Sequence, residues 1–354
     1  MAFIKSLILS GLIISFFFGQ LIRVNLFGST FPLLDIFIVS FASFNLFEHF
    51  FKKDFSLRNR PFVYFLVFAL FSLLINSFVF HFTLRIPVFY FIRLACLLSF
   101  FIFPPLISHL FKRFFYLSII ANIIFGLIQY FFWPDFTTFE ALNWDPHLYR
   151  LVSTFFDPTF TGLIYLFFLI YLFFQKKYWL MWLPYIALAL TYSRSTFLSL
   201  FIASIFVGLK IKNKFIPIIT GILLLITILI LPRLSGEGTK LERDSSIIAK
   251  IDNYREGFNT FLTSPVIGHG YNNLSLVRQI KNPDSHSNSG FDGSLMTILA
   301  TTGLIGFSLF LGGFIYQFNH SSLVFRTLLI ALFIHSLFSN SLLYPWTLIF
   351  LVLI

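Results

Sequence analysis

The sequence predicts an all-α, polytopic integral membrane protein: a helical bundle of about 11–12 transmembrane helices with one large extracytoplasmic loop. Composition, apolar segments of spanning length and the placement of charge predict it. Of the 354 residues, 58% are hydrophobic and 11% are charged, against about 45–50% and about 25% in ordinary soluble domains. The mean hydropathy is +0.88. This composition excludes a soluble enzyme, a disordered protein and a fibrous protein, because too few polar residues remain to cover a soluble surface.

Apolar segments follow one another along the whole chain, which we therefore expect to form a single membrane domain, 1–354. A helix needs about 20 apolar residues to cross the hydrocarbon layer, and irregular backbone cannot face lipid. The candidate spans are 3–22, 31–48, 61–80, 86–108, 113–133, 158–174, 178–192, 195–210, 214–231, 291–316, 323–340 and 342–354. Several are short or adjoin one another, and the last has only 13 residues, so it could be partial or re-entrant.

Basic residues gather in alternate connections and orient the bundle with its N-terminus in the cytoplasm. On the predicted cytoplasmic side lie Lys5, Lys52, Lys53, Arg58, Arg60, Lys112, Arg113, Lys176, Lys177, Lys210, Lys212, Lys214 and Arg326. These 13 of the 25 basic residues are opposed there by only Glu48 and Asp54, so they account for the whole net charge of +11. No basic patch is left over to bind nucleic acid, which excludes that class of partner.

The same orientation places two longer loops outside, residues 134–157 and the large loop 233–290. In the large loop, Ile247, Ile251, Tyr254, Phe258 and Phe261 recur at helical spacing, which predicts an amphipathic helix near 245–263. Its basic residues Lys250 and Arg255 could face lipid headgroups or form an ordinary solvated face.

Ionisable residues at membrane depth are costly and suggest function by default. Arg194, between two apolar runs, is open to two interpretations: an arginine snorkelling at a helix end, or a fixed guanidinium directed at a phosphate. His269, His286 and Asp292 are close enough to the outer boundary to act as bases, but they lack the tight spacing of a metal site. We therefore expect no metal and no cofactor.

Taken together, the residues resemble the superfamily of O-antigen ligases and O-antigen polymerases of bacterial envelopes. The resemblance covers nearly the whole chain and depends on the order of several short motifs. They are Gly19-Gln20 with Asp35; Arg150-Leu151-Val152-Ser153-Thr154-Phe155-Phe156-Asp157-Pro158; Tyr192-Ser193-Arg194-Ser195; Ser264-Pro265-Val266-Ile267-Gly268-His269-Gly270; Gly303-Leu304-Ile305-Gly306; and His335-Ser336-Leu337-Phe338.

Two departures favour a polymerase over a ligase. In members similar to ligases, a His-Asn pair begins eleven residues before the first glycine of the G-x-x-G motif. Here that position is Asp292, followed by Gly293, with His286 upstream. The loop arginine of the family corresponds to Lys250, with Arg255 beside Tyr254.

The resemblance implies a metal-independent glycosyltransferase in the cell (inner) membrane. Its donor would be an oligosaccharide linked to polyprenyl pyrophosphate and its acceptor a second glycan; a chain-length regulator is a further candidate partner. Arg194 would bind the pyrophosphate, with Lys250 or Arg255 as the second cation and Arg150 as a third contact, unless Arg150 instead pairs with Asp157. Asp292 or His286 would be the base.

Two other functions remain open at this point. One is an O-antigen ligase that transfers the glycan to lipid A core or to protein. The other is a flippase for lipid-linked oligosaccharides, which should show two related halves. The unexplained polar residues lie on the predicted outer side, which favours the enzyme.

Overall fold

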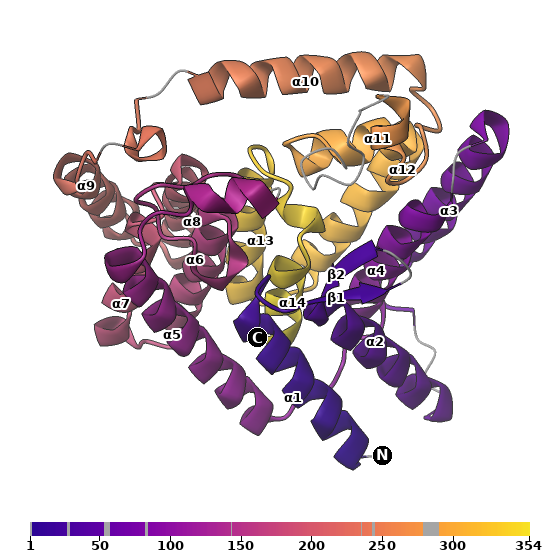
Figure 1. Ribbon diagram of the computed structural model, residues 1–354. Helices are drawn as coiled ribbons and strands as arrows, with labels where there is room; N and C mark the ends of the chain where they lie inside the picture. Colours follow the sequence, from indigo (N-terminus) through magenta and orange to yellow (C-terminus); the bar gives the residue numbers. More distant parts are fainter. Residues whose placement is uncertain are drawn as a thin grey trace.

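The computed structural model describes residues 2–26, 29–52, 57–81, 84–142, 144–234, 236–242, 245–278 and 290–354. Within them it is a bundle of α-helices (Figure 1), which confirms the predicted fold class. The bundle helices are α1 (Ala2–Phe18), α2 (Leu33–Phe51), α3 (Arg60–Phe80), α4 (Arg85–Ile102), α5 (His109–Phe132), α6 (Pro158–Phe174), α7 (Trp182–Ala189), α8 (Arg194–Ile211), α9 (Phe215–Ile230), α12 (Ser294–Asn319), α13 (Leu323–Ser336) and α14 (Pro345–Leu353). Two further α-helices, α10 (Ser245–Thr263) and α11 (Leu274–Val277), belong to the large loop.

Each predicted span coincides with one bundle helix, but the helices differ in length. By length and composition, six of the described helices could cross a membrane: α2, α3, α4, α5, α8 and α12. The predicted span 178–192 is divided into a 3-10 turn at Tyr178–Leu180 and the short helix α7. The predicted span 342–354 begins as a helix only at Pro345, because proline favours the first turn of a helix. The chain is thus a multi-pass membrane protein with several short helices.

One small β-hairpin departs from the all-α prediction. Strand β1 (Arg23–Leu26) pairs antiparallel with β2 (Ser29–Pro32), with Arg23 opposite Pro32 and Val24 opposite Phe31. The hairpin connects α1 to α2. It places Thr30, Phe31 and Pro32 against the cavity described below.

The helices that surround the bundle show the apolar surface expected of a lipid-facing protein. On α9, Ile218, Ile222, Leu225 and Leu229 are each at least half exposed. Exposed apolar side chains on successive turns would be unfavourable in water, and they suit hydrocarbon.

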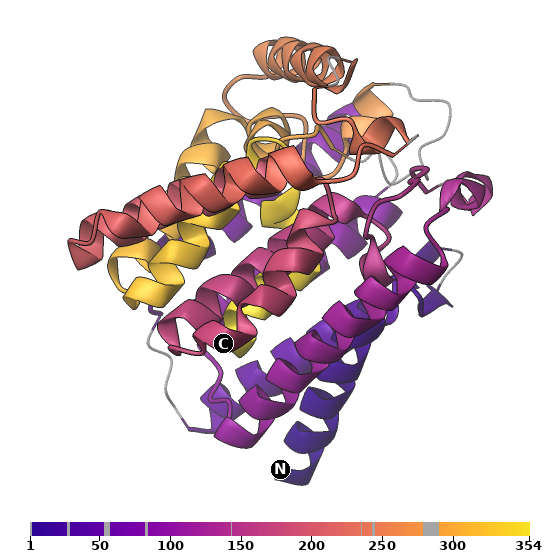
Figure 2. The same ribbon diagram turned by 90° about the vertical axis from the view of Figure 1, so that its left-hand side faces the viewer.

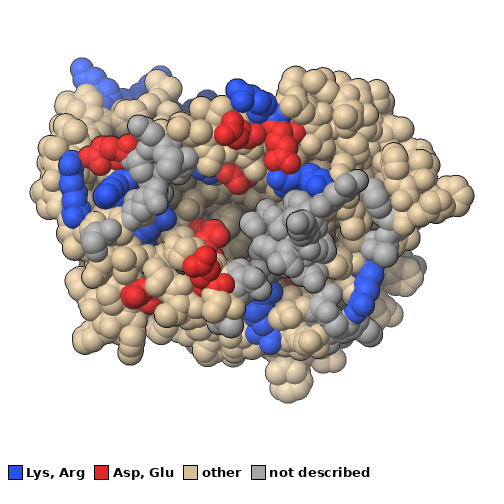
Figure 3. Space-filling model, turned by 45° about the horizontal axis from the view of Figure 1, so that its top comes forward, with Lys and Arg blue, Asp and Glu red and all other residues tan. Residues whose placement is uncertain are grey.

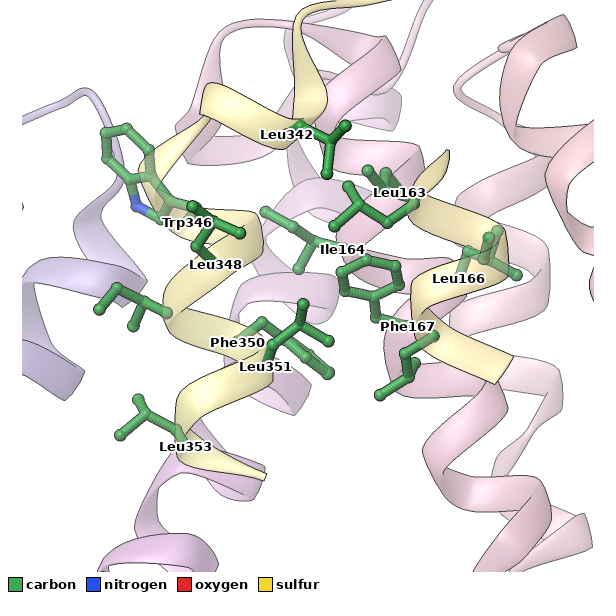
Figure 4. Packing of buried hydrophobic residues seen from close by; sticks show 14 of the residues in the cluster. Leu163, Ile164, Leu166, Phe167, Leu342, Trp346, Leu348, Phe350, Leu351 and Leu353 are labelled. Atoms are coloured by element: carbon green, nitrogen blue, oxygen red, sulfur yellow. The ribbon is translucent and has the colours of Figure 1, made fainter. Parts of the chain in front are cut away.

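The interior is built around α6, whose residues Leu163 to Phe168 are all almost completely buried. Figure 4 shows Leu163, Ile164 and Phe167 of α6 facing Phe350 and Leu351 of α14. The Phe167 and Phe350 rings lie 5.3 Å apart. Trp346 lies at the first turn of α14 with its indole directed away from α6 (Figure 4).

The two ends of the bundle differ. Helix α10 lies across the end opposite the N-terminus, as Figures 1 and 2 show from two sides. The loop between α5 and α6, which contains the 3-10 turn Thr137–Leu142, is at the same end (Figure 2). We call this end of the molecule the α10 face.

Candidate active site

A cavity of about 470 Å³ opens on the α10 face, within the range of small-molecule sites in proteins. Its walls come from six parts of the chain: the end of α1 with strand β2, helix α4, residues 144–160, α10, residues 271–297 as far as described, and residues 338–346. Figure 3 looks onto this face and shows acidic side chains gathered around a hollow near its centre. The cavity therefore exists only in the folded bundle.

Helix α10 is tied to the cavity wall through Lys250 and its neighbours. Lys250 Nζ lies 3.3 Å from Asp292 Oδ2 and donates a hydrogen bond to Phe338 O at 2.5 Å. The Tyr254 hydroxyl donates to Leu337 O. The backbone N–H of Asp292 donates to Asn253 Oδ1 at 2.8 Å. One face of α10 thus holds both Lys250 and Asp292 at the cavity.

The glycine motifs of the sequence explain how the end of α10 is held. Residues 264–270 pack against a break in α12 at Gly303, where φ is 63° and ψ is −170°. His269 N–H donates to Ala300 O at 3.1 Å and Gly270 N–H to Thr301 O at 2.8 Å. A Cβ atom on Gly268, whose φ is +73°, would lie 2.4 Å from the Thr301 backbone. We call this contact between residues 264–270 and 300–304 the glycine junction.

The motif 150–158 is held in place by buried hydrogen bonds. Gln129 Oε1 accepts from Val152 N–H at 3.1 Å and from Ser153 N–H at 3.2 Å. The Asp157 carboxylate caps α6 by accepting from the N–H groups of Thr159, at 2.6 Å, and Phe160, at 3.1 Å, as an N-cap residue does. The motif therefore presents Phe156 and Asp157 to the cavity.

Three carboxylates line the cavity, namely Asp145, Asp157 and Asp292. Desolvation, followed by the charges of Asp157 and Asp292, raises the pKa of the Asp145 carboxyl above its ordinary value. Like charges disfavour the ionisation of neighbouring carboxyl groups. A carboxylate is a chemically suitable acceptor for the proton of a hydroxyl group.

The region from α7 to α12 also has a counterpart among known families. Its residues match a family model described as O-antigen ligase, over positions 178–311.

Residues 178–311 match the O-antigen ligase family.

Over residues 178–311 the match confirms the resemblance predicted from the sequence, and it supports glycosyl transfer of the O-antigen ligase or polymerase type in general. A comparison with curated proteins found no match. The O-antigen ligase segment, residues 178–311, includes Arg194, Lys250, Arg255 and Asp292. Asp145 and Asp157 reach the same cavity from outside it.

Only one of the predicted pyrophosphate contacts lines the cavity. Lys250 lines it, whereas Arg194, Arg150 and Arg255 are not among its lining residues. Arg194, in the first turn of α8, donates to Leu241 O at 3.2 Å. Arg150 is buried and donates through Nε to Thr191 O at 2.9 Å.

Arg255 points into solvent. Its side chain is 72% exposed and lies 3.5 Å from Asp252. Of the two predicted bases, Asp292 lines the cavity, and His286 lies outside the described residues. No ion pair joins Arg150 to Asp157 in the described part of the chain.

Helix α4 contributes a second cation, Arg93, that the sequence analysis did not connect with the loop residues. Its guanidinium lies 3.2 Å from Asp35 Oδ2 and 4.4 Å from the centre of the Tyr90 ring. Arg93 lines the cavity. Asp145 was also missed; its position beside Trp144 in the outer loop 134–157 was the available signal.

No group of three or more His, Cys, Asp or Glu residues that could hold a metal ion occurs among the described residues. His269 is almost fully buried, and its Nε2 lies 2.8 Å from Thr263 Oγ1 and 2.9 Å from Thr260 O. Through these contacts His269 holds the last turn of α10 in place.

Proposed function

We propose that this protein transfers a glycan from polyprenyl pyrophosphate to a hydroxyl group of an acceptor sugar, and that it polymerises the repeat units of an O-antigen or exopolysaccharide. The observation that supports this most directly is the cavity on the α10 face, where Lys250 and Asp292 of the O-antigen ligase segment meet Asp145, Asp157 and Arg93. We infer that this face is extracytoplasmic and the N-terminus cytoplasmic, in the inner membrane, because the basic connections lie at the other end.

The reaction breaks the bond between the anomeric carbon and the pyrophosphate oxygen, and its electron pair stays on that oxygen. The acceptor hydroxyl oxygen forms the new glycosidic bond and its proton passes to a carboxylate. Negative charge grows on the leaving group, so cations placed beside it stabilise the transition state more than the ground state. No redox partner is needed.

Lys250 suits the role of the cation and Asp292 that of the base, because the two side chains are already paired at 3.3 Å. A pyrophosphate that binds Lys250 competes with the Asp292 carboxylate for the ammonium group. Displaced from Lys250, Asp292 becomes available to accept the proton of the acceptor hydroxyl. The arrival of the donor thus prepares the base.

Arg194 remains a proposed second contact for the pyrophosphate, together with Arg150 and Arg255. Arg194 adjoins the large loop through Leu241, so movement of residues 236–242 could bring its guanidinium to the donor. Full transfer activity in a well-expressed Arg194→Ala variant would remove it from the mechanism.

The experiment reconstitutes the protein in lipid with a polyprenyl-pyrophosphate-linked repeat unit as the sole substrate. A ladder of repeat multiples supports the polymerase, for which a chain-length regulator would be a further partner. Single transfer onto added lipid A core or protein, without a ladder, indicates the ligase. No covalent product in either test, together with movement of the lipid-linked sugar across the bilayer, indicates the flippase.

A further inference from the structure

We propose that Gln20, Tyr344 and Trp346 form a subsite of the cavity that binds one sugar ring of the glycan. This assignment rests on the proposed function only for the identity of the larger molecule; the chemistry of the subsite itself indicates a hydroxyl-rich ring. Gln20 follows α1, Tyr344 immediately precedes α14 and Trp346 is in its first turn, and all three line the cavity.

The first observation is a set of buried polar atoms that are poorly paired. Within the described residues, Gln20 Oε1, the Tyr344 hydroxyl and Trp346 Nε1 form no hydrogen bond of good geometry. The Gln20 side chain does contact the Tyr344 hydroxyl, whereas the indole N–H of Trp346 has no partner. Gln20 is only 8% exposed and Trp346 only 1%. Buried tyrosine hydroxyls and indole N–H groups normally have a partner, and an unpaired buried polar group is costly. A ligand that supplies hydroxyl groups would satisfy all three.

The second observation is the stack of aromatic rings beside these atoms. The Tyr344 ring lies 4.0 Å from that of Phe160, with an angle of 8° between the planes, and 4.8 Å from that of Trp346. Phe160 is itself a cavity residue. A pyranose ring has apolar C–H faces and a rim of hydroxyl groups, so it matches aromatic surface and neutral polar atoms together.

The arrangement of charge favours a neutral sugar over an anion in this part of the cavity. The indole N–H is a donor, the amide oxygen an acceptor and the phenol either, and none of them is charged. The carboxylates of Asp145 and Asp157 line the same cavity and would repel an anion, and the Arg93 guanidinium in the cavity wall is already paired with Asp35 at 3.2 Å. The pyrophosphate would therefore lie towards Lys250 and the sugar ring towards Gln20.

The test uses three variants that remove one polar atom or group each: Gln20→Leu, Tyr344→Phe and Trp346→Phe. Binding of D-glucose, D-galactose, D-mannose and N-acetyl-D-glucosamine to the purified full chain is measured by saturation-transfer NMR at millimolar concentration. We expect at least one sugar to bind the wild type and each variant to weaken that binding about fivefold, as the loss of one hydrogen bond does. Gln317→Leu and Trp179→Phe, whose positions are outside the cavity, are the matched controls.

The melting temperature of the sugar-free protein shows whether the three residues act in sugar binding or in stabilising the fold. Trp346→Phe should be as stable as the wild type or more stable, because the indole N–H has no protein partner. Gln20→Leu and Tyr344→Phe remove at most the contact between these two side chains and should melt within a few degrees of the wild type. Tyr344→Phe changes the fewest atoms and keeps the test valid if Trp346→Phe fails to fold.

A cavity that holds only water would give no saturation transfer from the wild-type protein, and that result would overturn the proposal. Wild-type affinity in the variants, or a loss of stability in all three, would overturn it as well. Because sugar binding is measured without transfer, binding that the variants weaken would stand even if the reconstituted protein made no glycan product. A normal product ladder with unchanged KM for the lipid-linked repeat unit in all three variants would reject the subsite alone.

Discussion

The glycine junction makes a sharp prediction for Gly268→Ala. The substitution places a Cβ atom 2.4 Å from the backbone carbonyl of Thr301, at a residue whose φ is +73°. Real Cβ atoms do not approach backbone so closely, so residues 264–270 must move away from α12. The end of α10 moves with them.

The cost has two parts. Placing alanine instead of glycine in the left-handed backbone conformation costs about 1–2 kcal/mol of conformational energy. Separation from α12 also weakens the hydrogen bonds of His269 and Gly270 to Ala300 and Thr301, each worth about 0.5–1.5 kcal/mol. Together these effects lower the free energy of unfolding by about 2–5 kcal/mol.

The assay is thermal unfolding of the detergent-solubilised protein, with Gly312→Ala in α12 as the control. A Cβ on Gly312 meets its nearest atom, Pro61 Cβ, only at 3.6 Å, and alanine favours a helix by about 1 kcal/mol over glycine. We expect a fall of several degrees for Gly268→Ala and none for Gly312→Ala. A Gly268→Ala protein as stable as the wild type would refute the reasoning.

Three further predictions concern the charged groups of the cavity. Arg93→Leu leaves Asp35 buried without its ion-pair partner and should lower the free energy of unfolding by about 3–5 kcal/mol. The double variant with Asp35→Leu should regain most of this stability. Equal melting temperatures of the wild type and Arg93→Leu would contradict the prediction. Since the folded-state pKa of Asp145 is raised, folded protein holds that proton more tightly, so stability should fall as the pH rises from about 4 through the folded pKa. Asp145→Asn should flatten this part of the profile, and an unchanged profile would refute it. Transfer by the reconstituted protein should survive excess EDTA, and loss of product that Mg²⁺ or Mn²⁺ restores would show a metal requirement.

The bundle was predictable because each span is a local property of the sequence. Runs such as 158–174 contain almost nothing but apolar residues, and such a run has few alternatives to a helix in lipid. Short helices such as α7 were not predictable in length, because the turn at Tyr192, with φ of 52°, depends on contacts with the rest of the bundle.

The site was predictable only where a motif marked it. Asp292 was found from its position relative to Gly303, and Lys250 from the stripe on its helix. Asp145 stands in no motif, and the motif Gly19-Gln20 gave no reason to select Gln20 as a site residue. Both line the cavity because tertiary packing brings their segments together.

For the arginines, the sequence marks the residue but does not predict the direction of its side chain. Arg194 was selected because an arginine between two apolar runs needs an explanation. Its guanidinium donates to the carbonyl of Leu241, which lies 47 positions away, and the residues around Arg194 in the sequence do not indicate this partner. A side chain's direction at a helix end is decided by such distant partners.

The central claim is that transfer takes place in the cavity on the α10 face with Lys250 beside the leaving group. The most direct measurement compares initial rates of product formation by wild type, Lys250→Met and Lys240→Met in the same lipid vesicles. Lys240 is exposed in the same large loop and does not line the cavity. The account predicts a loss of about 100- to 1,000-fold for Lys250→Met and a wild-type rate for Lys240→Met. A rate in Lys250→Met within a few fold of the wild type, with the protein folded and inserted, would contradict it.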